Sequence, residues 1–174
     1  ALAQDIKTTR QQDPWYRDPA TAIRVSTWTE APRGQATRYT HPIAGDDELT
    51  RERGLPVTVI TGKEDGPTLL LIAGEHGNEY ENIVALQESL QSLDTTVLKG
   101  RVVAVHCCSV DSYLNRTRLA EADGQNLARC YPGKKNGSLT ERVAYTLQND
   151  FLGQSGAHKP VCLVTLHTYG PGML

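Results

Sequence analysis

Apolar positions gather into short runs after residue 56, and each run has the length of a β-strand. The runs are rich in Val, Ile and Leu, which favour extended structure. The run at 68–73 is almost continuously apolar, as expected of a strand buried on both faces. We therefore predict four strands, over 57–61, 68–73, 101–108 and 161–166.

Two segments between these runs repeat their apolar positions every three or four residues, which predicts helices with one buried stripe. The first helix extends over 79–93, and its stripe consists of Ile83, Leu86, Leu90 and Leu93. The second helix opens at Ser138, where Glu141 three residues later completes a capping-box pattern. Its stripe consists of Leu139, Val143, Leu147 and Phe151.

Strands and helices thus alternate in the order β-β-α-β-α-β from residue 57 onward. Such alternation predicts an α/β fold in which helices flank a mixed, mostly parallel sheet. The Gly- and Pro-rich stretch 62–67 predicts a turn, and a long polar loop is expected at 111–137.

Residues 1–54 differ from the rest because they are polar and rich in turn formers. Short strands are expected there, around 22–29 and 37–42. We divide the chain into a polar N-terminal segment, 1–54, and a second part, 55–174, that contains the alternating elements.

Composition narrows the classes of partner. The 174 residues are 39% hydrophobic and 22% charged, as in ordinary globular proteins, and the net charge is −2. A nearly neutral chain has no general attraction to nucleic acid, and its apolar runs are too short to cross a membrane. We therefore expect neither a nucleic acid nor a membrane as partner. The sequence does not indicate the oligomeric state.

The four cysteines form no disulfide pattern, and Cys107, Cys108 and Cys162 lie in apolar runs where we expect them to be reduced and buried. Reduced thiols favour a cytoplasmic location. The opening residues Ala1-Leu2-Ala3 leave a processed, exported protein open as an alternative.

Metal-binding side chains follow two of the predicted strands. His76 and Glu79 come after the strand at 68–73, and His167 comes directly after the strand at 161–166. Reactive groups in open α/β sheets gather beyond the carboxyl ends of the strands. Two histidines and a glutamate are a known catalytic zinc set that leaves the fourth position for water. The sequence therefore predicts one zinc ion per chain.

Four motifs occur in a fixed order: Gly74-Glu75-His76-Gly77-Asn78-Glu79-Tyr80-Glu81, Asn115-Arg116-Thr117-Arg118, the segment 123–133, and Leu166-His167-Thr168. Together they resemble the succinylglutamate desuccinylase/aspartoacylase family, a branch of the zinc carboxypeptidase-like hydrolases. The resemblance covers roughly residues 55–168. It implies a zinc carboxypeptidase-like catalytic domain for the second part of the chain, of which 55–174 is the N-terminal portion.

The activity implied by the resemblance is zinc-dependent hydrolysis of an amide bond in a small carboxylate-bearing substrate, such as an N-acyl amino acid. The zinc would be held by His76, Glu79 and His167. Arg118 would be catalytic and stabilise the oxyanion of the tetrahedral intermediate. Substrate binding falls to Arg129, whose planar fork suits a carboxylate, and to Asn126.

The chain departs from the family pattern in ways that bear on this activity. Ala128 replaces an Asn before the motif arginine, and Thr165 replaces an Asp two residues before the last zinc histidine, so His167 is expected to lose outer support. The family's general base is a later glutamate, but none follows Glu141, and Glu75 is expected to point away from Glu79. We therefore expect a domain that is truncated after the third zinc ligand.

Two other hypotheses stay open. One is a non-catalytic or truncated module that binds zinc or a carboxylate and lacks the general base. The other is a thiol-based enzyme that uses Cys107, Cys108 or Cys130, the last favoured as a thiolate by the adjacent Arg129.

Overall fold

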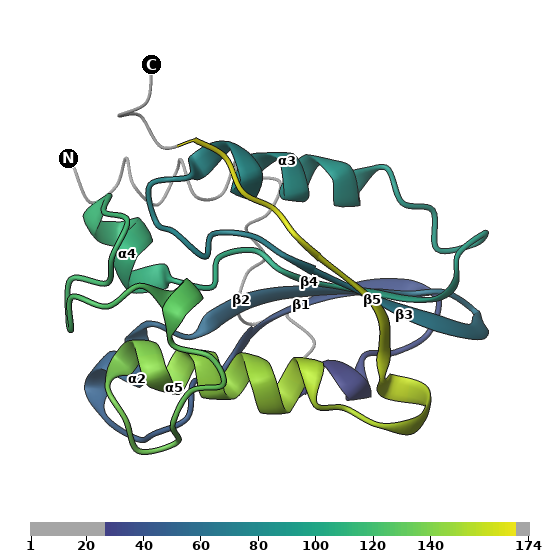
Figure 1. Ribbon diagram of the computed structural model, residues 1–174. Coiled ribbons are helices and arrows are strands. Elements are labelled where there is room, and N and C mark those ends of the chain that lie inside the picture. Colours follow the sequence, from purple (N-terminus) through teal and green to yellow (C-terminus); the bar gives the residue numbers. More distant parts are fainter. Residues whose placement is uncertain (1–26, 170–174) are drawn as a thin grey trace, which may run out of the picture.

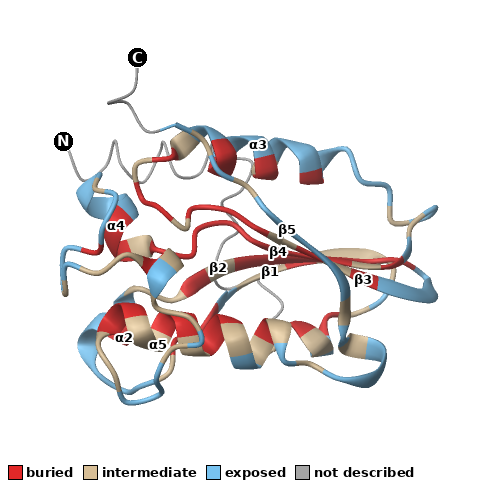
Figure 2. Cartoon of the chain, in the orientation of Figure 1, coloured by how far each residue is buried: buried red, intermediate tan, exposed pale blue. Residues whose placement is uncertain are grey.

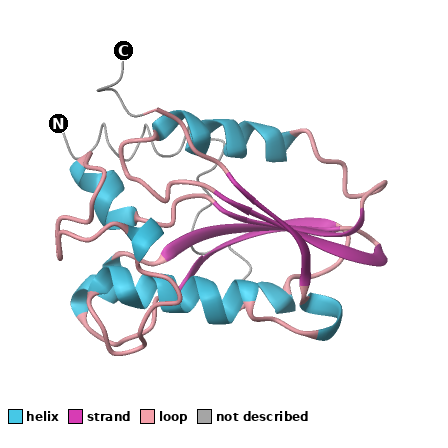
Figure 3. Ribbon diagram, viewed as in Figure 1, coloured by secondary structure: helices cyan, strands magenta, loops and turns pink. Residues whose placement is uncertain are grey.

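The computed structural model describes residues 27–169 and shows one five-stranded sheet with helices on both faces (Figure 1). The strands are β1 (Gln35–His41), β2 (Leu55–Thr61), β3 (Glu64–Ile72), β4 (Lys99–Val105) and β5 (Pro160–Thr165). The α-helices are α2 (Glu48–Glu52), α3 (Tyr80–Gln91), α4 (Val110–Asn115) and α5 (Leu139–Thr146). Helix α3 covers one face of the sheet, and α5 with α2 lies on the other (Figure 3).

The sheet is mixed, and its strands run in the order β1-β2-β4-β3-β5. Strand β3 pairs in parallel with both β4 and β5, whereas β1–β2 and β2–β4 are antiparallel. The predicted α/β fold with a mixed sheet and flanking helices is confirmed. Because β3, β4 and β5 share one direction, their carboxyl ends lie at the same edge of the sheet.

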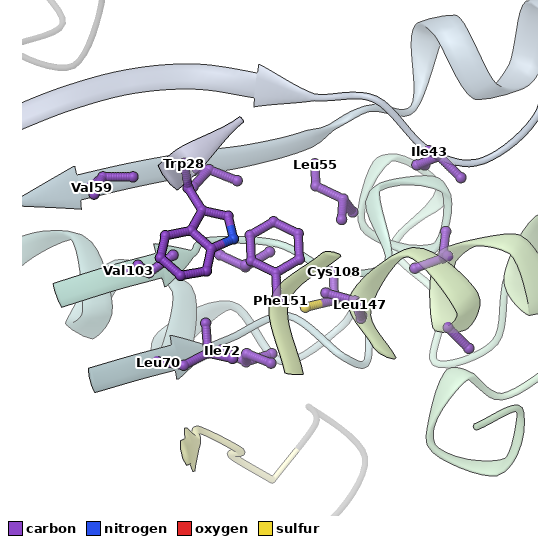
Figure 4. Close-up of a cluster of buried hydrophobic side chains, with 14 of the residues drawn as sticks. Trp28, Ile43, Leu55, Val59, Leu70, Ile72, Val103, Cys108, Leu147 and Phe151 are labelled. Atoms are coloured by element: carbon purple, nitrogen blue, oxygen red, sulfur yellow. The ribbon is translucent and has the colours of Figure 1, made fainter. Parts of the chain in front are cut away.

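The central strands bury both faces, as their apolar composition predicts. In β4, Val103 and Val105 belong to the core under α5, whereas Val102 and Ala104 belong to the core under α3. This alternation follows from the two-residue period of a strand. Figure 4 shows the α5-side core, in which Trp28 and Phe151 lie close together among aliphatic side chains.

The two predicted helices form with small differences at their ends. Helix α3 buries Ile83, Leu86 and Leu90, but it ends at Gln91, so Leu93 lies beyond it and is exposed rather than part of the stripe. Helix α5 has the full capping box at its first turn, and the helix continues as a π-helical stretch, η3 (Leu147–Leu152). The continuation keeps Phe151 buried in the core.

Several local expectations are wrong in detail. The turn after β2 is shorter than 62–67, because β3 already begins at Glu64. The first four residues of β3 are exposed, and they lack the apolar pattern that would mark them as strand. The stretch 111–137 is not a continuous loop, since most of α4 and the 3-10 turn η2 (Leu127–Arg129) lie in it. These elements are only six and three residues long, which is too short to show an apolar period.

The N-terminal segment contributes to the sheet. The strand predicted at 37–42 is present as β1, which pairs with β2 along its whole length. Of the strand predicted at 22–29, residues 22–26 lie outside the described residues, and Trp28–Glu30 form a 3-10 turn, η1, rather than a strand. Another such turn, η4 (Gly156–His158), precedes β5. The division at residue 54 stays a prediction.

Strand β5 forms where predicted, but it is an exposed edge strand (Figure 2). Val161 is 71% exposed, and Cys162 is exposed too, contrary to the expectation that this cysteine is buried. Only β3 pairs with this strand in the described part of the chain. Within the same residues, no helix combines the length and apolarity needed to span a bilayer.

Replacing Phe151 tests the core under α5. The side chain is fully buried, and the His41 ring packs against it with ring centroids 4.8 Å apart. Phe151→Ala is expected to lower the free energy of unfolding by about 3–5 kcal/mol, because it leaves a cavity. Urea denaturation measures this loss. Val97→Ala, at a position 77% exposed, should change stability by less than about 0.5 kcal/mol. An equal effect of both variants would contradict the assigned core.

His106 gives a pH-dependent prediction. Burial lowers its pKa to about 4, and Arg38 adds to the effect. A folded-state pKa below the unfolded value of about 6.5 means that stability is fully present above pH 6.5 and falls as the pH drops toward 4. Protonation of His106 should therefore lower the free energy of unfolding by about 2 kcal/mol at pH 5 relative to pH 7. Unfolding of the chain and of His106→Gln at pH 7 and pH 5 measures this, and an unchanged pH dependence in the variant would refute it.

Candidate metal centre

The loop after β3 is shaped by glycines. Gly74 has a φ of +65°, a left-handed conformation that favours glycine, and a side chain there would meet the Cys107 backbone at 2.9 Å. A side chain at Gly77 would lie 2.0 Å from the carbonyl carbon of Ser112. The loop therefore passes directly against neighbouring backbone, and its tight course directs His76 and Glu79 to one point.

The structure brings His76, Glu79 and His167 together, with ligand atoms within 4.8 Å of one another. Glu79 lies between the two rings: its Oε1 is 2.9 Å from His76 Nδ1, and its Oε2 is 3.1 Å from His167 Nδ1. His167 comes from the other side of β3, following β5, where the Leu166 N–H donates to the Ile72 carbonyl. The predicted juxtaposition of the three side chains is present.

The donor set suits a metal ion. His76 Nδ1 is buried and makes no hydrogen bond within the described residues, although Glu79 Oε1 is only 2.9 Å away. Two imidazole nitrogens and a carboxylate that converge in this way match the nitrogen and oxygen donors that zinc takes in three-ligand sites. A bound cation would satisfy His76 Nδ1, which has no hydrogen-bond partner among the described residues.

The outer nitrogens of both rings face polar partners. His76 Nε2 is 3.2 Å from Asn126 Oδ1, and His167 Nε2 is 3.1 Å from Glu75 Oε2. Each histidine thus presents Nδ1 to Glu79 and Nε2 to an outer acceptor. Sequence analysis did not anticipate the contact between Glu75 and His167, since only the fold brings the end of β5 beside the loop that follows β3.

Glu79 is held in its ionised form. Burial alone would raise its pKa, but the backbone N–H of Thr168 and the charges of His76 and His167 outweigh burial, and the pKa is lowered. Thr168 N–H donates to Oε2 at 3.1 Å, and Asn82 donates to the same oxygen at 3.3 Å. A carboxylate with these donors remains a negatively charged ligand at neutral pH.

The two predicted arginines differ in position. Arg118 donates from Nη1 to Glu79 Oε1 at 3.0 Å, and its side chain is half exposed, so it lies at the rim of the candidate centre. Arg129 is exposed, and within the described residues its guanidinium donates a hydrogen bond to the carbonyl of Ala128. The structure therefore brings Arg118 to the three ligands but not Arg129.

Three of the cysteines, Cys107, Cys108 and Cys130, have the properties of packing residues. Burial raises the pKa of Cys107 to about 12 and that of Cys108 well above its ordinary value. The pKa of Cys130 is also raised, by burial and then by Asp123, so the adjacent Arg129 does not favour its thiolate as predicted. Thiols with raised pKa values are poor nucleophiles, which argues against the thiol-based hypothesis.

Comparison with known proteins gives consistent results. The model of the family "Succinylglutamate desuccinylase/Aspartoacylase catalytic domain" matches residues 65–173. A curated relative, the N-alpha-acetyl-L-2,4-diaminobutyric acid deacetylase of Halomonas elongata, is 39% identical over 103 residues, which are 59% of this chain and 30% of that protein.

Solved structures share the fold. The product-bound ectoine utilization protein EutE (DoeB) of Ruegeria pomeroyi has a TM-score of 0.67 at 26% identity, covering 80% of this chain and 42% of that one. The succinylglutamate desuccinylase/aspartoacylase of Rhodobacter sphaeroides has a TM-score of 0.68 at 27% identity, covering 79% and 41%.

The chain spans about a third of the curated relative and about two fifths of these solved chains. A metallo-carboxypeptidase of Pseudomonas aeruginosa, 20% identical with a TM-score of 0.53 over 66% of this chain and 32% of that one, shares the fold alone. The family model, by contrast, matches more than half of the chain in the region that holds all three candidate ligands. The chain belongs to the succinylglutamate desuccinylase/aspartoacylase family.

Proposed function

We propose that this chain binds one zinc ion through His76, Glu79 and His167 and forms the metal-binding part of a hydrolase. The observation that supports the proposal most strongly is the convergence of two imidazole nitrogens, one from buried His76 and one from exposed His167, on one ionised carboxylate. The proposed reaction is cleavage of the amide bond in a small carboxylate-bearing substrate. An N-acyl amino acid is the proposed class, because the curated relative is named a deacetylase of an N-acetyl amino acid.

Zinc in such a site lowers the pKa of a water molecule and polarises a carbonyl group. Residues of the chain would orient the ligands and stabilise the charge that develops on the substrate. Asn126 would orient His76 through its contact with Nε2. Arg118 would present free N–H groups at the rim, where negative charge develops on the carbonyl oxygen.

Arg129 would bind the substrate carboxylate from the exposed loop. Its guanidinium offers a planar fork of donors that fits a carboxylate with two parallel hydrogen bonds. Its exposed side chain leaves most of that fork available in the described structure. Ala128 contributes no side-chain donor beside it, so the arginine would make this contact with its own groups.

A second candidate function is a module that binds zinc or a carboxylate without catalysis. The observation that favours it is the distribution of carboxylates: Glu79 is a ligand, Glu75 faces His167, and Glu81 accepts from Thr168 Oγ1. Incubation of the zinc-loaded chain with N-acetyl-2,4-diaminobutyrate, N-acetylaspartate and N-succinylglutamate separates the candidates. Release of free amine supports the hydrolase, and binding without release supports the module.

Zinc binding is the first prediction for the site. The purified chain should bind one equivalent of zinc, and His167→Ala and Glu79→Gln should each lose most of the affinity, because each removes one of three ligands. Competition with a chromophoric chelator measures the affinity. Glu88→Gln, an exposed change on the same helix, is the control and should bind like the unchanged chain. A chain that binds no zinc would refute the proposal.

The two arginines should affect different kinetic constants. In the zinc-loaded protein, Arg118→Ala should lower kcat by about 10²–10³-fold, as expected for loss of an oxyanion donor. Arg129→Ala should mainly raise KM, since it removes a contact made equally in the ground state and the transition state. Steady-state kinetics with an N-acyl amino acid measures both. An effect of Arg118→Ala confined to KM would contradict its assigned role.

A further inference from the structure

Glu75 occupies an unusual place for a loop carboxylate. It lies between Gly74 and the ligand His76, and its side chain is only 13% exposed. Its Oε2 is 3.1 Å from Nε2 of His167, a residue that arrives from a different strand. The preceding Gly74 has a left-handed backbone conformation.

Glu75 contacts the His167 ring on the side opposite Glu79. Nδ1 of the ring faces Glu79 Oε2 at 3.1 Å, and Nε2 faces Glu75 at the same distance. An imidazole that binds a metal through one nitrogen carries its proton on the other and donates it to an acceptor. A carboxylate at Nε2 therefore selects the tautomer whose Nδ1 lone pair is directed at the candidate centre.

His167 needs such support more than His76 does. Its side chain is 39% exposed, and it follows β5, an exposed edge strand with little packing of its own. His76, by contrast, is buried in a loop fixed by close backbone contacts. The His76 ring lies beside the His167 ring, with centroids 5.3 Å apart, and polar contacts add to the orientation that this limited packing gives.

Glu75 in turn interacts with Tyr131. Burial raises the pKa of Tyr131, and its interactions with Cys108 and with Glu75 raise it further. The Tyr131 ring packs against the core that contains Trp28. The series His167, Glu75 and Tyr131 thus connects an exposed candidate ligand to the hydrophobic core.

We infer that Glu75 is the positioning residue for the metal ligand His167, orienting its ring and fixing its tautomer through Nε2. The inference rests on the proposed metal site and adds an outer carboxylate to it. It also alters the expectation drawn from Thr165: this side chain has no carboxylate for His167, but Glu75 supplies one from the loop after β3.

Metal affinity tests the inference directly. Glu75→Ala should weaken zinc binding by about 10–100-fold, as loss of an outer carboxylate typically does. Glu75→Gln keeps an acceptor of the same shape without the charge, so its affinity should lie between that of Glu75→Ala and the unchanged chain. Glu88→Gln, which removes an exposed carboxylate from α3, is the matched control and should bind zinc normally. Chelator competition gives the affinities of the three variants and of the unchanged chain, and circular dichroism of the metal-free proteins verifies folding.

A cobalt spectrum adds a readout that a purely structural role would not change. Co²⁺ in place of zinc should give visible bands in the chain, and Glu75→Gln should shift them, because the basicity of the His167 ligand changes. Unchanged affinity and an unchanged cobalt spectrum in Glu75→Gln would overturn the inference while leaving the metal site intact. Failure of the unchanged chain to bind either metal would instead refute the proposed function.

Discussion

The parallel pairing of β3 with β5 is the constraint on which the candidate site depends. It aligns Ile72 with Thr165, and the Leu166 N–H donates to the Ile72 carbonyl at 2.8 Å. This register places His167 beside the loop that carries His76 and Glu79, although 88 residues separate Glu79 from His167. A shift of one residue would turn every side chain of β5 to the other face of the sheet. The strand register therefore brings the three ligands together, and side-chain chemistry acts on the arrangement that results.

Electrostatic interactions then stabilise the buried carboxylate at the site that the strand register brings together. Glu79 is almost fully buried, and a buried carboxylate is costly unless it is paired and hydrogen-bonded. The Thr168 N–H, two imidazoles and Arg118 provide that pairing. The same arrangement leaves His76 Nδ1 without a hydrogen bond among the described residues, which is where a cation would fit. Structure and proposed function thus meet at this carboxylate, because the two imidazoles that help to make its burial tolerable are also the groups that would share a metal with it.

Sequence reasoning reached the alternating fold, the capping box of the second helix and the three candidate ligands, because each is signalled locally by periodicity, by spacing or by a motif. It failed where the answer depends on packing between distant segments. The apolar run at 161–166 resembles a buried strand, yet its exposure is decided by its position at the edge of the sheet. The role inferred for Glu75 is invisible for the same reason, since its partners His167 and Tyr131 lie far away in the chain. Asn126 was predicted from motif resemblance to bind substrate, whereas its contact with His76 emerges only from the fold.

The central claim is that His76, Glu79 and His167 share one zinc ion, and X-ray absorption at the zinc edge tests it most directly. The account predicts a first shell of low-atomic-number ligands with two histidine nitrogens at about 2.0–2.1 Å and a carboxylate oxygen at about 2.0–2.2 Å. The imidazole scattering should decrease in His167→Ala. A shell that contains sulfur at about 2.3 Å, or one that His167→Ala leaves unchanged, would contradict the account.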